Sequence, residues 1–139
     1  MDKIIAWVVT LFTAIIGFMF GNDVTHYQLI YVLIFAMFSD MLFGSINAAN
    51  KNEFKWNYFR IGITKKVGEL FVIALIYQVD KIGLVQGSDF EHFVIGAFIG
   101  YELISALNKI EVTGVPIPKF IFDKIKVIFK IFGSDKIEQ

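Results

Sequence analysis

The fold is decided by the first fifty residues, where two apolar stretches follow each other: residues 4–22, IIAWVVTLFTAIIGFMFGN, and residues 24–49, VTHYQLIYVLIFAMFSDMLFGSINAA. The first stretch carries no charge and the second carries only Asp40. A helix rises about 1.5 Å per residue, so about 20 apolar residues cross the roughly 30 Å of hydrocarbon in a bilayer. Each stretch is therefore long enough to span a membrane.

The composition of the whole chain agrees with a membrane protein. Of its 139 residues 56% are hydrophobic and 19% are charged, with 13 basic and 13 acidic side chains. A soluble domain is about 45–50% apolar and about 25% charged. A net charge of zero argues against a nucleic-acid partner, and the small size leaves little room for a catalytic domain. The chain has no cysteine, which removes disulfides, thiolate metal sites and cysteine nucleophiles.

The rest of the chain continues as shorter, more polar segments. Residues 67–79 and 93–107 are apolar enough for two further helices, and both prolines fall in residues 114–118, where any helix should stop. We therefore expect an all-α integral membrane domain over residues 1–113, with two long apolar and two shorter half-polar membrane helices. Residues 114–139 form a separate tail with a basic amphipathic helix.

Basic residues predict the orientation of the chain. Residues 51–66 form a basic, aromatic stretch that we expect to be a loop at the membrane surface, and the tail is again rich in lysine. Because basic loops stay inside, four passes with both termini in the cytoplasm satisfy every segment. If segments 67–79 and 93–107 lie on the surface instead, only the first two passes remain. The predicted cytoplasmic basic residues are Lys51, Lys55, Arg60, Lys65, Lys66, Lys119, Lys126 and Lys130.

Three carboxylates interrupt the apolar segments and are the candidates for a mechanism. A charge at mid-bilayer costs roughly 2.5–3.5 kcal/mol, so each needs a partner, water or a proton. Glu69 follows two lysines at helical spacing, and a local ion pair explains it. Neither Asp40 nor Glu102 has a basic residue within a helical turn, so their partners must come from other helices, other subunits or water. Glu102 shares a helix face with Ser105 and Lys109. We expect Asp40, Glu102 and Ser105 either to line a polar seam or to form a buried hydrogen-bonded knot.

Small residues recur at helical spacing, which favours close helix packing in a membrane. This spacing predicts packing faces at Gly17, Gly21, Ala36, Gly44, Ala48, Gly96 and Gly100. We expect a homo-oligomer in contact with the lipid bilayer. The two histidines lack any metal-ligand spacing, and we find neither a catalytic motif nor a phosphate-binding loop. We therefore expect no cofactor, no metal and no enzymatic activity.

These residues resemble the phage lysis and toxin-secretion holin family, also called holin family 4. The most specific similarity is an acidic residue, a serine three positions later and then a Gly-Val-Pro-Ile-Pro sequence, here Glu102, Ser105 and residues 114–118 with Gly114, Pro116 and Pro118. Asp40 with Gly44, and residues 62–66 (GITKK), are similar to two further family motifs. The chain departs from the family at Asn108-Lys109, where members often have an acidic residue and Asn.

The resemblance implies a protein that oligomerises in the bacterial cytoplasmic membrane and opens lesions. A phage endolysin or a large toxin then leaves the cytoplasm, without necessarily touching the holin. Three alternatives remain open from sequence: an antiholin that delays lysis, a non-lytic membrane scaffold or accessory subunit, and a selective channel for small ions.

Overall fold

A computed structural model describes residues 2–21, 24–84 and 90–131 of the chain. These residues form helices and no strand, so the expected all-α fold is confirmed. The helices are α1 (Asp2–Phe20), α2 (Val24–Asn50), α3 (Trp56–Lys81), α4 (Phe90–Val112) and α5 (Lys119–Ile131). Three of them, α1, α2 and α4, are long and apolar enough to cross a membrane.

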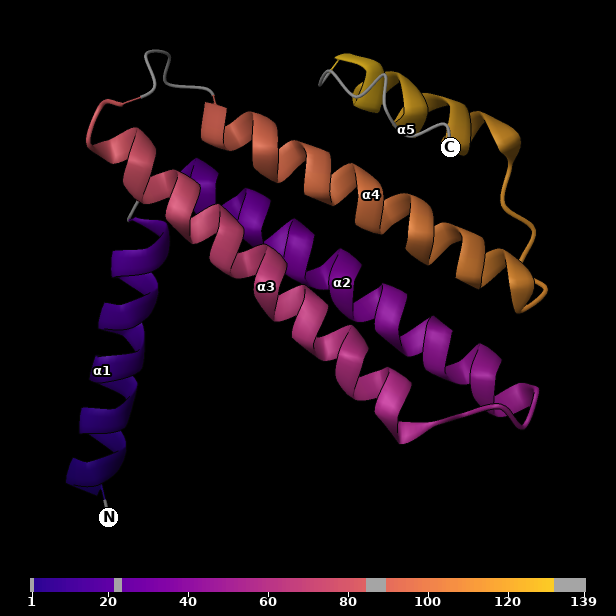
Figure 1. Ribbon diagram of the computed structural model, residues 1–139, viewed down its shortest axis with the longest axis horizontal. Helices are drawn as coiled ribbons and strands as arrows, with labels where there is room; N and C mark the ends of the chain where they lie inside the picture. Colours follow the sequence, from indigo (N-terminus) through magenta and orange to yellow (C-terminus); the bar gives the residue numbers. More distant parts are fainter. Residues whose placement is uncertain (1, 22–23, 85–89, 132–139) are drawn as a thin grey trace.

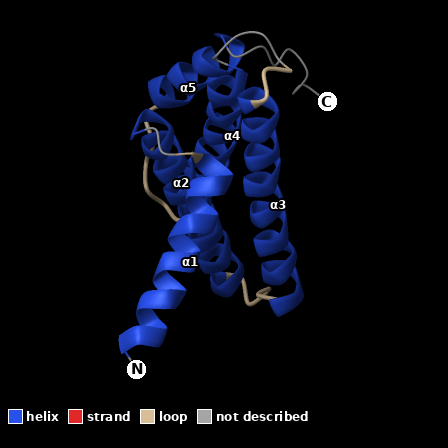
Figure 2. Ribbon diagram, turned by 90° about the vertical axis from the view of Figure 1, so that its left-hand side faces the viewer, coloured by secondary structure: helices blue, strands red, loops and turns tan. Residues whose placement is uncertain are grey.

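Helices α2, α3 and α4 lie side by side, and the contact between α2 and α4 is the most extensive of all (Figures 1 and 2). The centre of this three-helix bundle is apolar, with one fully buried side chain from each helix: Leu33, Ile73 and Ile95. In a membrane, close packing of such side chains holds the helices together, because lipid removes the hydrophobic driving force between them.

Helix α1 leans away from the bundle and meets it only near its C-terminal end (Figure 1). There Phe20 joins the apolar core, and the side-chain amide of Gln78 donates a hydrogen bond to the Phe18 carbonyl at 2.5 Å. The rest of α1 exposes large apolar side chains such as Trp7, which is 75% exposed. An apolar surface of this extent is stable in lipid and not in water.

Glycine follows three of the helices, α1, α3 and α4, in the left-handed conformation that favours this residue. Gly21, which follows α1, has φ +71°, and Gly114, which follows α4, has φ +95°. Gly21 is buried, and a Cβ placed on it would lie 2.2 Å from the hydroxyl oxygen of Tyr77 on α3. The predicted break before the prolines is thus confirmed, with α4 ending at Val112 and α5 beginning directly after Pro118.

Helix α3 corrects one expectation. Residues 56–66 were expected in a surface loop but form the first part of α3, which is 26 residues long. The basic residues there have high helix propensity, and the aromatic ones do not prevent a helix. Only residues 51–55 connect α2 to α3. The charges on α3 keep it outside the set of helices that are apolar enough to span a membrane.

Helix α5 is amphipathic, as expected, and packs against α4 (Figure 2). Its Ile121, Phe122 and Ile125 side chains are half-buried, whereas Lys119 and Lys126 are exposed. The side chain of Lys130 lies outside the described part of the structure.

Candidate functional site

Four charged side chains from three helices meet inside the bundle. Lys66 of α3 contacts Asp40 of α2, with 3.2 Å between Nζ and Oδ2, and it also donates a hydrogen bond to Oε2 of Glu102 on α4. Lys109, also on α4, donates to Oδ1 of Asp40 at 2.5 Å. The Asp40 side chain is 7% exposed and that of Glu102 is 0% exposed. We call these residues, with Glu69 and Ser105, the ionic cluster.

Glu69 and Ser105 complete the ionic cluster. The Ser105 hydroxyl lies within hydrogen-bonding reach of the Asp40 carboxylate. The carboxyl group of Glu69 lies within the same reach of Glu102. The structure thus pairs Lys66 with Asp40 and Glu102, not with Glu69 as the local spacing indicated.

Helix periodicity explains why these side chains converge. On α4, Glu102, Ser105 and Lys109 are three and four residues apart, so they share one face, and Lys66 and Glu69 share a face of α3 in the same way. Asp40 lies on the α2 face that meets α4. Asp40, Glu102, Lys66 and Lys109 each find a partner of opposite sign on another helix. This pairing offsets part of the cost of placing these charges in the membrane.

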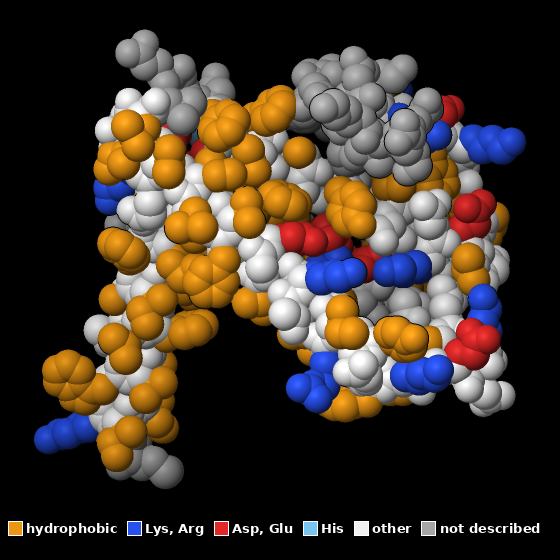
Figure 3. Space-filling view, viewed as in Figure 1, with side chains coloured by type: hydrophobic (Ala, Val, Ile, Leu, Met, Phe, Trp, Pro, Cys, Tyr) orange, Lys and Arg blue, Asp and Glu red, His pale blue; other side chains and the backbone are white. Residues whose placement is uncertain are grey.

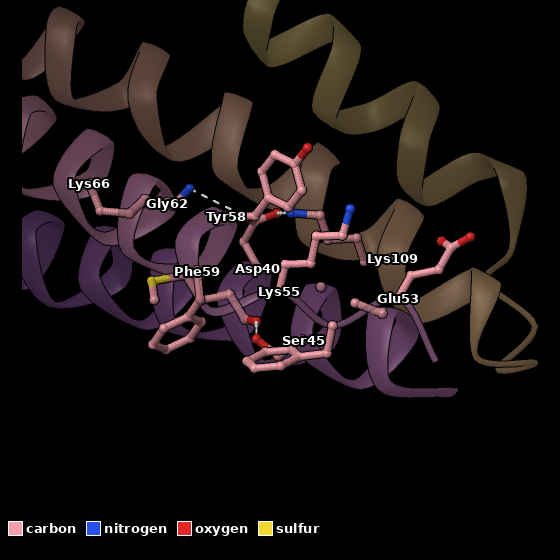
Figure 4. A pocket seen from close by; sticks show the side chains of 13 residues that line it. Asp40, Ser45, Glu53, Lys55, Tyr58, Phe59, Gly62, Lys66 and Lys109 are labelled. Carbon is pink, nitrogen blue, oxygen red and sulfur yellow. Dashed lines mark hydrogen bonds and ion pairs between the residues drawn. The ribbon is translucent and has the colours of Figure 1, made fainter. Parts of the chain in front are cut away.

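A cavity of about 210 Å³ opens beside Asp40, at the end of the bundle where α2 connects to α3. Figure 4 shows Lys66 and Lys109 reaching Asp40 there, and the side chains of Tyr58 and Phe59 also line the cavity. The space-filling view shows acidic and basic side chains together near the middle of this face, next to apolar side chains (Figure 3). The ionic cluster therefore lies beside a cavity, which Asp40, Lys66 and Lys109 help to line.

The three predicted polar residues are brought together by this arrangement. Asp40, Glu102 and Ser105 all belong to the ionic cluster, and both carboxylates find their basic partners on other helices. Lys66 was expected at the membrane surface, but its side chain is only 14% exposed and points into the bundle. Two carboxylates within reach attract it inward. Lys51, Lys55, Arg60 and Lys65 are exposed, as are Lys119 and Lys126.

The small residues act partly within the protomer. On α2, Ala36 is buried at 2% exposure and Gly44 lies against Lys109, so this face meets α4. Ala48 lines the cavity, Gly100 is buried, and Gly17 and Gly96 are half-buried. Gly21 departs from the predicted helix face: it lies past the end of α1 and packs against Tyr77 from a left-handed turn.

Sequence reasoning missed a second polar contact, at the opposite end of the bundle. His26 at the start of α2 is 2% exposed, and its Nδ1 lies 3.1 Å from Oε1 of Glu91 at the start of α4. The rings of Phe20 and Tyr77 flank this imidazole, with centroids 6.3 Å and 5.5 Å away. The pair is 65 positions apart in sequence, so no local spacing could reveal it.

No group of His, Asp and Glu that could hold a metal ion occurs among the described residues. What the ionic cluster can do is hold charged and polar side chains inside an apolar bundle. If the helices re-pack, the same side chains become available to line water.

Comparisons with known proteins agree with the resemblance noted from sequence. The model of the bacteriophage holin family matches residues 5–130. An uncharacterized protein of Listeria monocytogenes is 27% identical over 137 residues, covering 98% of this chain and 94% of that protein. An uncharacterized protein of Halalkalibacterium halodurans is 24% identical over 132 residues, with coverages of 92% and 96%. No solved structure matches the chain significantly. The family match spans residues 5–130 of the 139 residues, so the chain is a membrane protein of the bacteriophage holin family.

Proposed function

We propose that the protein is a holin that oligomerises in the bacterial cytoplasmic membrane and opens lesions through which an endolysin or a large toxin leaves the cytoplasm. The ionic cluster is the observation that carries this proposal. Five of its six members are ionisable, and they lie between helices of the bundle. Apart from His26 and Glu91 at the opposite end, the other large side chains described as buried are apolar. A rigid anchor would be more stable with apolar side chains there, because a buried ion pair rarely outweighs its own desolvation.

The position of Asp40 fits a lesion that crosses the bilayer. Helix α2 has 27 residues, which corresponds to about 40 Å at the helical rise of about 1.5 Å per residue. Asp40 lies ten residues before its C-terminal end, or about 15 Å inward. In a spanning helix the carboxylate is thus deep in the membrane, where it needs Lys66 and Lys109 in the closed protomer or water in an open lesion.

The same pairing supports four passes. Helix α3 is too charged to span a membrane alone, but its Lys66 is neutralised by Asp40 and Glu102 within the bundle. Its basic N-terminal half, with Arg60 and Lys65 exposed, then lies toward the cytoplasm, as the positive-inside rule requires. With α5 packed on α4, both termini are cytoplasmic in this arrangement.

Oligomerisation would proceed through the surfaces that the protomer leaves exposed. The small-residue face of α2 is used against α4 within one chain, whereas α1 is almost entirely exposed. We therefore place the subunit contacts on α1 and on the outer face of α2. No catalytic step is part of this function.

Induced expression in bacteria tests the proposal, with and without a cytosolic murein hydrolase. Optical density and release of a cytosolic reporter enzyme are followed. We expect a delayed, sudden collapse that requires the hydrolase. Steady growth with the protein present in the membrane would instead favour a scaffold or an antiholin, and loss of ions without release of the reporter would favour a small-ion channel.

Two variants connect the function to the ionic cluster. Asp40→Asn and Glu102→Gln remove one charge each and change the side-chain volume little. We expect a changed onset of lysis or a changed size limit for released proteins. Glu111→Gln, at an exposed position of the same helix α4, is the control and should behave as the wild type. Normal timing and normal lesion size in both cluster variants would contradict a role for these carboxylates in the opening.

A further inference from the structure

The ionic cluster contains more acidic than basic groups. Three carboxyl groups, on Asp40, Glu69 and Glu102, face the two ammonium groups of Lys66 and Lys109. Lys65, which is adjacent to Lys66 in sequence, is exposed, and so are the charged side chains described on α5. These groups therefore do not compensate the charges of the ionic cluster. If all five groups are ionised, the interior of the bundle carries one uncompensated negative charge.

The uncompensated charge can be located from two carboxylate oxygens that lack a hydrogen-bond donor. Oε1 of Glu102 and Oε2 of Glu69 are buried and accept no hydrogen bond from the described residues. Glu102 is fully buried, and Lys66 satisfies only its other oxygen, Oε2. A buried polar atom without a partner costs roughly 1–3 kcal/mol, and more when it is charged. Native structures contain few such atoms unless something occupies the site.

The two carboxyl groups are also close to each other. Glu69 lies within hydrogen-bonding reach of Glu102, although two carboxylates repel. Two carboxyl groups within hydrogen-bonding reach of each other commonly share one proton, because two negative charges at such short range cannot both persist in a poorly solvated site. We propose that Glu69 and Glu102 together bind one exchangeable proton in the closed protomer at neutral pH. The proton bridges α3 and α4 and brings the cluster to neutrality.

A proton fits this place better than a metal cation. Neither Glu69 nor Glu102 lines the cavity beside Asp40, which could hold a hydrated ion. Alkali and alkaline-earth ions require about six oxygen ligands, as the hard cations do generally. A proton needs only the two carboxyl oxygens that are already adjacent.

One consequence rests on the proposed function. When helices separate and water reaches Glu69 and Glu102, both carboxyl groups ionise and the proton is released. The closed protomer then binds one proton more than the open lesion, so acid favours the closed form and alkaline conditions favour opening. For one proton the ratio of open to closed protein changes about tenfold per pH unit. Glu69→Gln removes the shared proton and should flatten this dependence.

Infrared spectroscopy of the purified full chain in lipid vesicles tests the proton directly. We expect the carbonyl stretching band of a protonated carboxylic acid at pH 7, and its loss in Glu69→Gln. Glu53→Gln, at an exposed position of the connection between α2 and α3, is the matched control and should keep the band. Subtracting the spectrum of Glu69→Gln from that of the wild type leaves only the band of this site. Any band from the buried carboxyl group of Glu91 is present in both spectra and cancels.

Two results would overturn the proposal: no protonated carboxyl band at pH 7, or a band that Glu69→Gln leaves unchanged. A missing band together with thermal stability that depends on sodium or potassium would assign the site to a metal cation. The measurement is independent of lysis. A missing band with normal lysis contradicts the proton site alone, and a normal band without lysis contradicts the proposed function alone.

Discussion

Replacing Asp40 by Asn should destabilise the bundle, because it removes the charge that Lys109 and Lys66 share. Asp40 is the only carboxylate of the ionic cluster for which an ion pair with Lys109 is described, at 2.5 Å. Lys66 also contacts Asp40 but keeps a second partner in Glu102. The substitution therefore leaves the ammonium group of Lys109 without an anionic partner. The ammonium group of Lys66 loses one of its two anionic partners.

The size of the effect follows from the exposure of the two lysines. Breaking a buried ion pair by removing one partner costs about 3–5 kcal/mol. Lys109 is 36% exposed and can turn its ammonium group toward water, whereas Lys66 is only 14% exposed. We therefore expect Asp40→Asn to lower the free energy of unfolding by about 2–3 kcal/mol, below the full cost of a buried pair. Lys109→Met should cost less, since Asp40 then retains Lys66.

Reversible unfolding in mixed detergent micelles, followed by circular dichroism, measures these changes. The variant Asp40→Asn/Lys109→Met should be less destabilised than the sum of its single variants, with a coupling of about 0.5–3 kcal/mol, as contacting pairs show. The exposed control Glu111→Gln should stay within about 0.5 kcal/mol of the wild type. Wild-type stability of Asp40→Asn, or strict additivity in the double variant, would refute the reasoning.

The remaining predictions concern the opposite end of the bundle and use the same unfolding measurement. Gly21→Ala should lower the free energy of unfolding by more than the roughly 1–2 kcal/mol that a left-handed backbone costs a residue with a Cβ. The reason is that the new Cβ would lie 2.2 Å from the hydroxyl oxygen of Tyr77. Gly83→Ala is its control, with the same φ of +71° and open space around it; equal losses would contradict the Tyr77 contact. His26→Leu removes the imidazole 3.1 Å from Glu91 and should lower the free energy of unfolding by about 1–3 kcal/mol, as expected when a buried polar group loses a hydrogen-bonding partner. An unchanged unfolding midpoint would show that the pair adds nothing to stability.

Much of the fold could be predicted from hydropathy. The first two helices, the break at residues 114–118 and the amphipathic α5 follow from local patterns that fix helix length and ends. Helix α3 was predicted too short, because a hydropathy pattern counts the charges of residues 56–66 as loop-like. Those charges are compatible with a helix, and Lys66 among them is neutralised only by residues from two other helices.

The candidate site could be predicted only in part, because local patterns reveal an unusual charge but not the residues that pair with it. Asp40 and Glu102 stood out because no local partner explained a charge in an apolar segment, and this absence correctly indicated partners from elsewhere. The identity of those partners depends on how α2, α3 and α4 pack. Lys66 is 36 positions from Glu102, and Lys109 is 69 positions from Asp40. Such contacts leave no signal in the spacing of one sequence.

Accessibility of Ser105 during lysis tests most directly whether the ionic cluster comes to line water in an open lesion. The chain has no cysteine, so Ser105→Cys introduces a unique thiol next to Asp40. A membrane-impermeant thiol reagent is added to cells before and after the onset of lysis. Phe38→Cys, on the exposed apolar surface of α2, reports a lipid-facing position. We predict that position 105 is protected before onset and labelled after it, while position 38 stays unlabelled. Lysis that proceeds with position 105 protected throughout would contradict the account.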